Sequence, residues 1–303
     1  MKIKKLISPI IYILIIIGVA IIFDPLTDRL AELLQHQPTV ITPSSNNYFR
    51  NKNFKFVRQS EDFIPYSKQD LKNIFFSVLN NGWTRFTFHC PREYTNCIRD
   101  IETLSNDPST LTHINNFVHP FNSFHRINIS FSESGEVTIE IERLYQTDTI
   151  NKVNIKVDEL IEEHITDDMN IRDKILAIHD VIINNAFYDL NHETSEFKSN
   201  KAYGPLLQGY GICTGFTDAM AIFLNRFNVP NFRIASGDHI WNAVYLDGEW
   251  LHLDVTWNSP IDESNPTNQV LIHTFFLINT DELKQHAITN HDFNPLIYQE
   301  FLN

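Results

Sequence analysis

The chain has 303 residues, 43% of them hydrophobic, and carries a formal charge of −13 at pH 7. A chain of this length can form one large domain or two medium ones with substantial hydrophobic cores. The acidic balance argues against a nucleic-acid partner, because phosphate binding requires clustered lysine and arginine side chains.

Residues 1–23 predict a transmembrane anchor. Lysines near the start precede an uncharged apolar run over residues 6–23, which as a helix would be roughly 27 Å long, close to the hydrocarbon thickness of a bilayer. The lysines favour a cytoplasmic N-terminus, with the rest of the chain outside. A signal peptide cleaved after the small residues 18–20, giving a secreted protein, is the alternative. Both interpretations place the bulk of the chain outside the cytoplasm.

Residues 24–47 predict a linker, because most of this stretch is rich in proline, serine and asparagine. Residues 48–150 predict a smaller α+β domain. Ser67 is the expected N-cap of a helix that ends near Gly82, and a strand over 84–89 and a helix over 93–104 follow. Alternating runs at 126–131 and 137–144 predict a hairpin. No catalytic set of residues is visible in this half, so we expect a structural or substrate-presenting role.

The three cysteines suit an extracytoplasmic protein with one disulfide. Cys90 and Cys97 are close in sequence, and Cys213 is distant, so a Cys90–Cys97 bridge is the natural pairing. Two unpaired thiols at 90 and 97 are the alternative.

Residues 151–303 predict the domain that carries the chemistry. A helix is expected over 171–181, and the polar loop 187–203 follows as a mobile segment. Cys213 opens another helical pattern that ends before Pro230, and the partial positive charge of a helix N-terminus favours a thiolate there. Glycines around Cys213, at positions 209, 211 and 215, are expected to let a substrate approach the backbone.

Two alternating runs after this helix predict a hairpin around Asp247-Gly248. With a two-residue turn, residue 246 pairs with 249, and every pair of partners sums to 495. This register places His239 and Asp254 on one face as diagonal neighbours, within reach of an imidazole and a carboxylate. A three-residue turn would place them on opposite faces.

A thiol, a histidine and a carboxylate together form the nucleophile, base and orienting group of covalent acyl transfer. Cys213 is the expected nucleophile, His239 the base and Asp254 the orienting group, with the Cys213 N–H and Gln208 as oxyanion donors. Taken singly, each residue has an ordinary structural explanation. His252 on the same face is the alternative base. Metal binding fits poorly, because no second thiolate lies near Cys213. His286 and His291, with Asp292, are assigned to a polar C-terminal loop.

Several motifs in this half resemble the bacterial branch of the transglutaminase-like superfamily. They are Ala202-Tyr203-Gly204, Gly211-Ile212-Cys213-Thr214-Gly215-Phe216, His239-Ile240-Trp241-Asn242, and Trp250-Leu251-His252-Leu253-Asp254-Val255-Thr256-Trp257. The resemblance covers about residues 170–280. It implies an α+β, papain-like core in which a helix carrying cysteine packs on an antiparallel sheet carrying histidine and aspartate. Aromatic residues of these motifs are the expected lining of the substrate cleft: Tyr203, Trp241 and Trp257.

Two residues depart from the family pattern, since Thr217 and Ile240 are bulkier than usual, and they are expected to narrow the site or to alter substrate choice. The resemblance does not by itself imply calcium, the sequence shows no Asp-rich calcium loop of the EF-hand kind, and we expect no cofactor. Together with the anchor predicted at residues 1–23, the resemblance leads us to expect a membrane-anchored, outward-facing cysteine enzyme that acts on peptide or side-chain amides, with cell-wall peptides among the candidate substrates. A surface scaffold or binding protein that retains the fold without turnover is the alternative.

Overall fold

The computed structural model describes residues 46–50, 53–260, 270–286 and 289–302. The predicted membrane anchor, and all but the last two residues of the predicted linker, lie outside these ranges. Within them, no helix has the length and apolar character needed to cross a bilayer.

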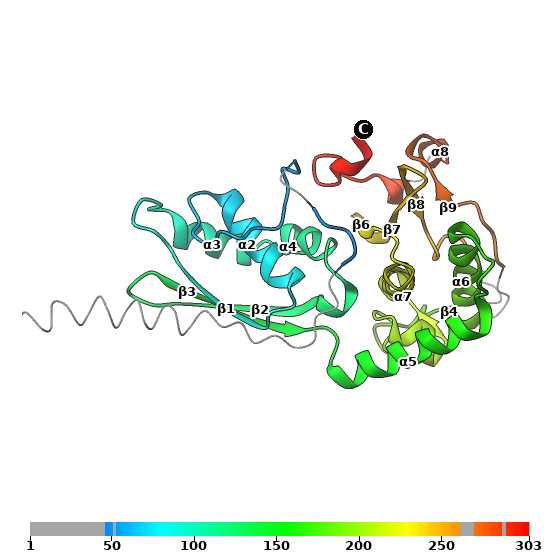
Figure 1. The fold of residues 1–303 in the computed structure, drawn as a ribbon. Coiled ribbons are helices and arrows are strands. Elements are labelled where there is room, and N and C mark those ends of the chain that lie inside the picture. The colour runs from blue at the N-terminus through cyan, green and yellow to red at the C-terminus, as the bar shows by residue number, and fades with distance from the viewer. Residues whose placement is uncertain (1–45, 51–52, 261–269, 287–288, 303) are drawn as a thin grey trace, which may run out of the picture.

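The N-terminal half has three helices beside a three-stranded antiparallel sheet with strand order β1-β3-β2 (Figure 1). Its elements are α2 (Lys68–Asn80), β1 (Arg85–His89), α3 (Cys97–Ser105), α4 (Pro108–Asn115), η1 (Pro120–Asn122), β2 (Phe124–Phe131) and β3 (Glu136–Arg143). Ser67 caps α2 as predicted, with its hydroxyl accepting a hydrogen bond from the Asp70 N–H at 3.3 Å. The predicted hairpin is also confirmed, whereas α4 was not predicted.

The C-terminal half is built around the largely buried helix α7 (Cys213–Arg226), which packs against a four-stranded antiparallel sheet with strand order β6-β7-β8-β9. The sheet consists of β6 (Asn231–Ser236), β7 (His239–Leu246), β8 (Glu249–Leu253) and β9 (Phe276–Ile278). The other elements are α5 (Thr147–His164), α6 (Ile171–Asn185), β4 (Phe187–Tyr188), η2 (Gly204–Gln208), β5 (Tyr210–Gly211), α8 (Thr280–Gln285), η3 (Thr289–His291) and η4 (Gln299–Leu302). A helix carrying the cysteine therefore packs on an antiparallel sheet, as expected.

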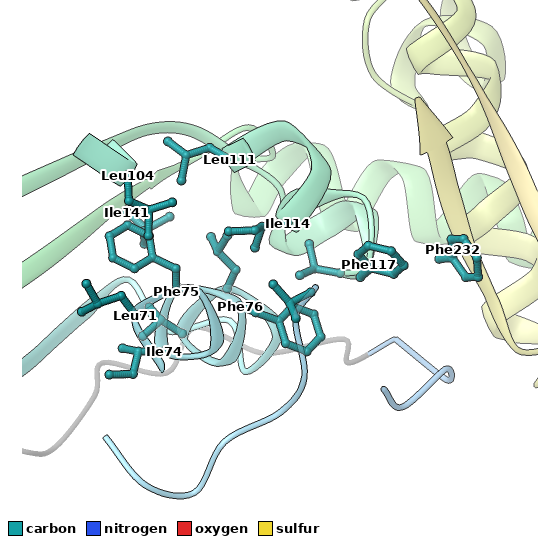
Figure 2. Packing of buried hydrophobic residues seen from close by; sticks show 14 of the residues in the cluster. Leu71, Ile74, Phe75, Phe76, Leu104, Leu111, Ile114, Phe117, Ile141 and Phe232 are labelled. Carbon is teal, nitrogen blue, oxygen red and sulfur yellow. The ribbon is translucent and has the colours of Figure 1, made fainter. Parts of the chain in front are cut away.

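One hydrophobic core spans both halves of the molecule. Phe117, which follows α4, lies 5.0 Å from Phe232 on β6, measured between ring centroids (Figure 2). Phe232 in turn stacks on Tyr298 near the C-terminus at 6.0 Å. In addition, α5 runs through the boundary predicted between residues 150 and 151. The sheet of the second half is thus packed against the helices of the first, and the proposed division into domains remains a prediction.

The two ends of the described chain are joined by a buried ion pair. Arg50 Nε lies 2.8 Å from Glu300 Oε1, and both side chains are fully buried. The Arg50 guanidinium also lies 3.9 Å from the centroid of the Phe117 ring. The Tyr48 hydroxyl donates to the same glutamate oxygen at 2.9 Å. These contacts fix the C-terminal segment against the shared core.

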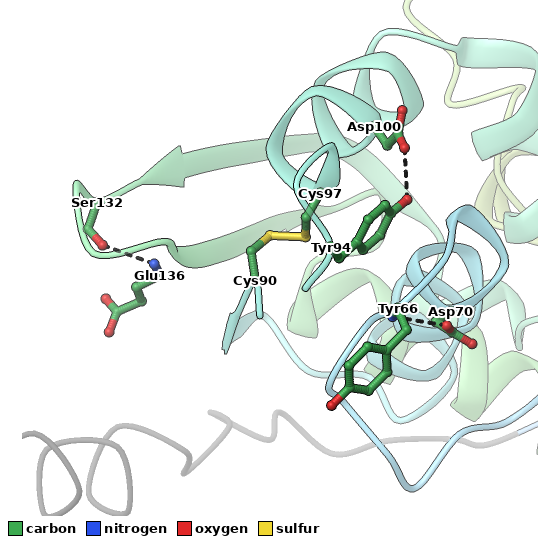
Figure 3. Close-up of a disulfide and its surroundings, with 8 residues drawn as sticks. All are labelled: Tyr66, Asp70, Cys90, Tyr94, Cys97, Asp100, Ser132 and Glu136. Carbon is green, nitrogen blue, oxygen red and sulfur yellow. Dashed lines mark hydrogen bonds between the residues drawn. A yellow bond between two sulfur atoms is a disulfide. The ribbon is translucent and has the colours of Figure 1, made fainter. Parts of the chain in front are cut away.

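A disulfide joins Cys90 and Cys97, whose Cα atoms lie 5.8 Å apart (Figure 3). It links the residue after β1 to the first residue of α3, and the nearby Tyr94 hydroxyl donates to Asp100 at 2.8 Å. The predicted pairing is confirmed. Because the sequence has three cysteines, Cys213 is the one free thiol of the chain.

Candidate active site

Cys213 is the first residue of α7 and is half-buried. Its neighbour Ile212 is the N-cap, and the Ile212 N–H donates to the Ser199 carbonyl at 2.9 Å. The rest of the helix is buried from Gly215 to Leu224. The core therefore fixes α7 in place. The first turn of this helix holds the thiol of Cys213 at the edge of the protein interior.

The glycines near Cys213 accommodate the chain itself. A Cβ added at Gly215 would lie 2.2 Å from the Ser199 carbonyl oxygen, and one added at Gly204 would lie 2.4 Å from that of Tyr210. The polar loop is held close by Asp189, which accepts hydrogen bonds from the hydroxyls of Ser195 and Ser199. The expectation that Gly215 makes room for a substrate is therefore wrong, because the loop backbone already occupies that space.

The predicted hairpin register is confirmed. Leu246 pairs with Glu249, and the ladder continues to Asn242 opposite Leu253. The turn residues Asp247 and Gly248 have φ values of 54° and 92°, as a two-residue turn of the primed type requires. The ladder ends there, so Asp254 lies one residue beyond β8.

The structure brings the three predicted residues together. Asp254 Oδ2 lies 2.6 Å from His239 Nε2, and Cys213 lies close enough to the same imidazole to raise its pKa. Because an ionised carboxylate only accepts hydrogen bonds, Nε2 carries the proton that His239 shares with Asp254. Nδ1 is the ring nitrogen left for the thiol. The arrangement matches the order of nucleophile, base and orienting group expected from the sequence.

Burial and charge act in opposite directions on His239 and Asp254. Burial opposes the charged imidazolium, but hydrogen bonds and charge interactions with Asp254 and Cys213 raise the pKa of His239 from 6.5 to about 9. Burial also opposes the ionised form of Asp254, yet hydrogen bonds from His239 and His291 lower its pKa to about 2. The site therefore stabilises an imidazolium beside a carboxylate at neutral pH.

His291 also contacts Asp254, and the sequence did not indicate this. Its Nε2 lies 2.8 Å from Asp254 Oδ2, the oxygen that also faces His239. The other oxygen, Oδ1, accepts the Trp257 N–H at 3.0 Å. His291 is 4% exposed, so its assignment to a polar C-terminal loop is wrong, whereas His286 is exposed. The chain returns to the site through η3, which no periodic pattern in the sequence predicts.

Tyr188 is a second neighbour of Cys213 that the sequence did not indicate. It lies on β4 opposite Gly211 of β5, and the backbone of Cys213 is near enough to affect the pKa of its phenol. Burial raises the pKa of this phenol, and the charge of Cys213 acts in the same direction. A substrate carbonyl that approaches the Cys213 N–H would therefore enter beside a phenol.

His252 is excluded as the base by its surroundings. Its Nδ1 accepts the Trp241 indole N–H at 3.0 Å, and its Nε2 lies 3.1 Å from the Thr280 hydroxyl. Burial lowers its pKa to about 3. The Trp241 ring lies between His252 and His239, with its centroid 6.2 Å from the one and 5.8 Å from the other. Of the two candidate histidines, the structure places His239 beside the thiol.

The remaining predicted residues take different positions around the site. Trp241 is fully buried and stacks on His239, so it supports the imidazole instead of lining an open cleft. Trp257 is half-buried beside His239, and Tyr203 is half-buried under the Lys198 ammonium. The Gln208 side-chain oxygen accepts the Lys198 N–H at 2.8 Å. The roles of Gln208, Tyr203 and Trp257 toward a substrate remain predictions.

The bulkier Thr217 and Ile240 contact each other: the Thr217 hydroxyl donates to the Ile240 carbonyl at 3.0 Å. Both residues are buried where α7 meets β7. The Thr217 side chain thus joins the helix to the strand backbone, and the expected effect of these two residues on substrate choice remains a prediction.

Within the part of the chain that the structure describes, two groups of side chains bring possible metal ligands within 4.8 Å of one another, and hydrogen bonds account for both. In the group His179, Asp180 and His273, the Asn258 amide oxygen accepts the Phe275 N–H, so its NH₂ faces His179 Nε2 at 3.0 Å. His179 Nδ1 therefore carries a proton, which it donates to Asp180 at 2.8 Å. In the group around Asp254, both nitrogens that face the carboxylate carry protons for the same reason.

One family model matches part of the chain. Residues 158–255 match the model of the transglutaminase-like superfamily. A solved structure described as a TGase aligns at 13% identity and a TM-score of 0.34, over 48% of this chain and 47% of that one. A putative cysteine protease from Cytophaga hutchinsonii aligns at 15% identity and a TM-score of 0.28, over 43% of this chain and 61% of that one. The chain thus spans less than two thirds of either protein. Among curated proteins, none gives a significant match.

Proposed function

Because residues 158–255 carry a transglutaminase-like domain, we propose that this chain is a cysteine-dependent enzyme that forms a thioester with amide carbonyls of peptides or protein side chains. One observation carries the proposal. The buried imidazole of His239 hydrogen-bonds to Asp254, and the thiol of Cys213 lies close enough to the same imidazole to raise its pKa. A histidine with a purely structural role does not require a thiol as its neighbour, and Cys213 is the one free thiol of the chain.

In the proposed reaction, His239 has already taken the proton of Cys213 to form an imidazolium, and the thiolate of this ion pair attacks the carbonyl carbon of the substrate. The negative oxygen that forms is stabilised by the Cys213 N–H. The imidazolium then gives its proton to the departing amine as the carbon–nitrogen bond breaks, which leaves a thioester on Cys213. Water or a second amine attacks this thioester, with His239 again acting as base. Asp254 keeps the Nε2–H of the imidazole in place throughout.

We place this enzyme at the outer face of a cell membrane. The apolar run over residues 6–23 supports an anchor, and the Cys90–Cys97 bridge supports an oxidising compartment. Protein or peptide chains are then the expected substrates, and cell-wall peptides are candidates among them. Hydrolysis gives a peptidase or deamidase, and amine attack gives a cross-linking transferase.

The proposal is tested by alkylation of Cys213 with iodoacetamide. The full chain in detergent is labelled across a range of pH, and wild type is compared with His239→Ala and with His286→Ala as a control at an exposed histidine. We expect Cys213 to react at neutral pH at least about tenfold faster in wild type and in the control than in His239→Ala. If Cys213 reacts no faster than a simple thiol in all three proteins, the chain is instead a scaffold or binding protein.

A further inference from the structure

The proposed triad leaves one buried histidine unexplained. His291 shares the oxygen Oδ2 of Asp254 with His239, at 2.8 Å and 2.6 Å from the two Nε2 atoms. Its ring is enclosed by aromatic side chains, with Trp241 and Phe275 at centroid distances of 4.9 Å and 5.1 Å. A buried histidine needs both of its nitrogens satisfied, and among the described residues this one has a partner for only one of them.

The hydrogen bonds define how His291 is protonated. Asp254 is ionised at neutral pH and can only accept, so His291 Nε2 must carry the donated proton. His291 Nδ1 is buried and meets no partner among the described residues. The ring is therefore held in the Nε2–H tautomer, with its one hydrogen bond directed at the carboxylate. Three N–H groups thus reach Asp254: two on Oδ2, and that of Trp257 on Oδ1.

We propose that His291 is a positioning residue which competes with His239 for one oxygen of Asp254 and so limits how tightly the carboxylate holds the imidazolium. This inference rests on the proposed function. Each donor draws electron density from the shared oxygen, so two donors compete for the same negative charge. An imidazolium held too tightly would be a poor acid when the leaving amine needs a proton. His291 thus matches the base to its second role, and its one hydrogen bond within the described residues goes to Asp254.

The charged and titratable groups around His291 belong to several elements. Asp254 follows β8, His239 lies on β7 and the thiol on α7, while the buried His252 lies on β8 and is affected by the charge of Lys284 on α8. His252 carries no charge near neutral pH, because burial lowers its pKa to about 3. His239 and Cys213 are therefore the groups whose titration a change at His291 would report.

The test is the pH profile of Cys213 alkylation by iodoacetamide in His291→Leu, which removes the donor, and in His291→Gln, which can restore an N–H near the position of Nε2. The change in alkylation rate at the alkaline end of the profile, called the upper limb here, reports the loss of the His239 proton. We expect His291→Leu to move that limb upward by about half a pH unit or more, and His291→Gln to return it toward wild type. His286→Leu is the matched control, because His286 packs on the same Phe275 ring at 4.9 Å without touching Asp254.

An unmoved upper limb in His291→Leu, or an equal shift in the control, would overturn the inference. If His291→Leu does not fold, long-range proton–nitrogen NMR of wild type decides, with the peak assigned from its loss in His291→Gln. A proton on Nε2 and none on Nδ1 is the expected result, and the opposite tautomer overturns the inference. Failure of the proposed function is distinct, because His239→Ala would then leave the reactivity of Cys213 unchanged.

Discussion

His239 is the residue in which burial and charge oppose each other most directly. It is 7% exposed, and yet the carboxylate of Asp254 and the thiol of Cys213 hold its pKa above the ordinary value. Burial alone would favour the neutral ring, as it does for His252. The difference between these two histidines is their partners: His239 faces a carboxylate, whereas His252 faces an indole and a hydroxyl.

This pKa predicts how the contribution of His239 to stability depends on pH. The pKa is about 9 in the folded protein against an ordinary value of 6.5, so the folded state binds this proton more tightly. The stabilisation is complete below about pH 6.5 and is lost as the pH rises through about 9. His239→Ala should therefore lower the free energy of unfolding most near about pH 6 and progressively less toward about pH 9. Urea unfolding at a series of pH values measures the difference. A loss that grows with pH would contradict the assignment.

Single residues of the site were predictable from the sequence only where they lie in a helix or strand that its own hydrophobic pattern predicts. Cys213 begins a helix that its own apolar stripe predicts, and His239 and Asp254 lie in alternating runs. His291 lies 37 positions after Asp254, in a short helical turn whose neighbours show no period. Its place depends on the long-range packing of the C-terminal segment, so its role could not be derived from the sequence.

At the scale of elements, a buried ion pair joins α7 to β6. Arg233 Nη1 lies 2.6 Å from Asp218 Oδ1 and 3.1 Å from the hydroxyl of Ser123, which follows η1. The Tyr145 hydroxyl donates to the other oxygen of Asp218 at 2.8 Å and accepts the Ala202 N–H at 2.7 Å. One carboxylate thus links the helix of the thiol to the sheet of the histidine, to the N-terminal half and to the segment before η2.

Breaking this pair should destabilise the protein strongly. Arg233→Met leaves the carboxylate of Asp218 buried without its cation, so we expect a loss of about 3–5 kcal/mol in the free energy of unfolding. Adding Asp218→Leu should recover part of that loss, because the buried charge is then removed. A double-mutant cycle by urea unfolding measures the coupling. Additive losses, within about 0.5 kcal/mol, would show that the two side chains act independently.

The elements were predictable where the turn chemistry was specific. Asp247-Gly248 determines the register of β7 and β8, because a two-residue turn fixes which residues face each other. By contrast, α5 was not predicted, although its buried Val153, Val157 and Leu160 recur at helical spacing. Charged residues surround this narrow apolar stripe of α5. The side chains that pack against the stripe come from elements distant in the sequence. Packing of this kind becomes visible only in the folded molecule.

At the scale of the whole molecule, the N-terminal half is packed against the sheet that carries His239. Phe117 contacts Phe232 of β6, and Arg50 pairs with Glu300 across the shared core. The sequence predicted two domains because it shows two sets of elements, but it does not show which apolar faces meet. The core that spans both halves supports the sheet from the side opposite α7. The geometry of the site thus depends on the whole chain.

The most direct test of the thioester chemistry uses a simple activated ester. The full chain is incubated with p-nitrophenyl acetate at neutral pH, and the acetylated residue is found by mass spectrometry of the intact protein and its peptides. We predict one acetyl group on Cys213, released by hydroxylamine, that forms at least about tenfold more slowly in His239→Ala. Absence of the acetyl group from Cys213, or equal rates in the two proteins, would contradict a nucleophilic thiol activated by His239.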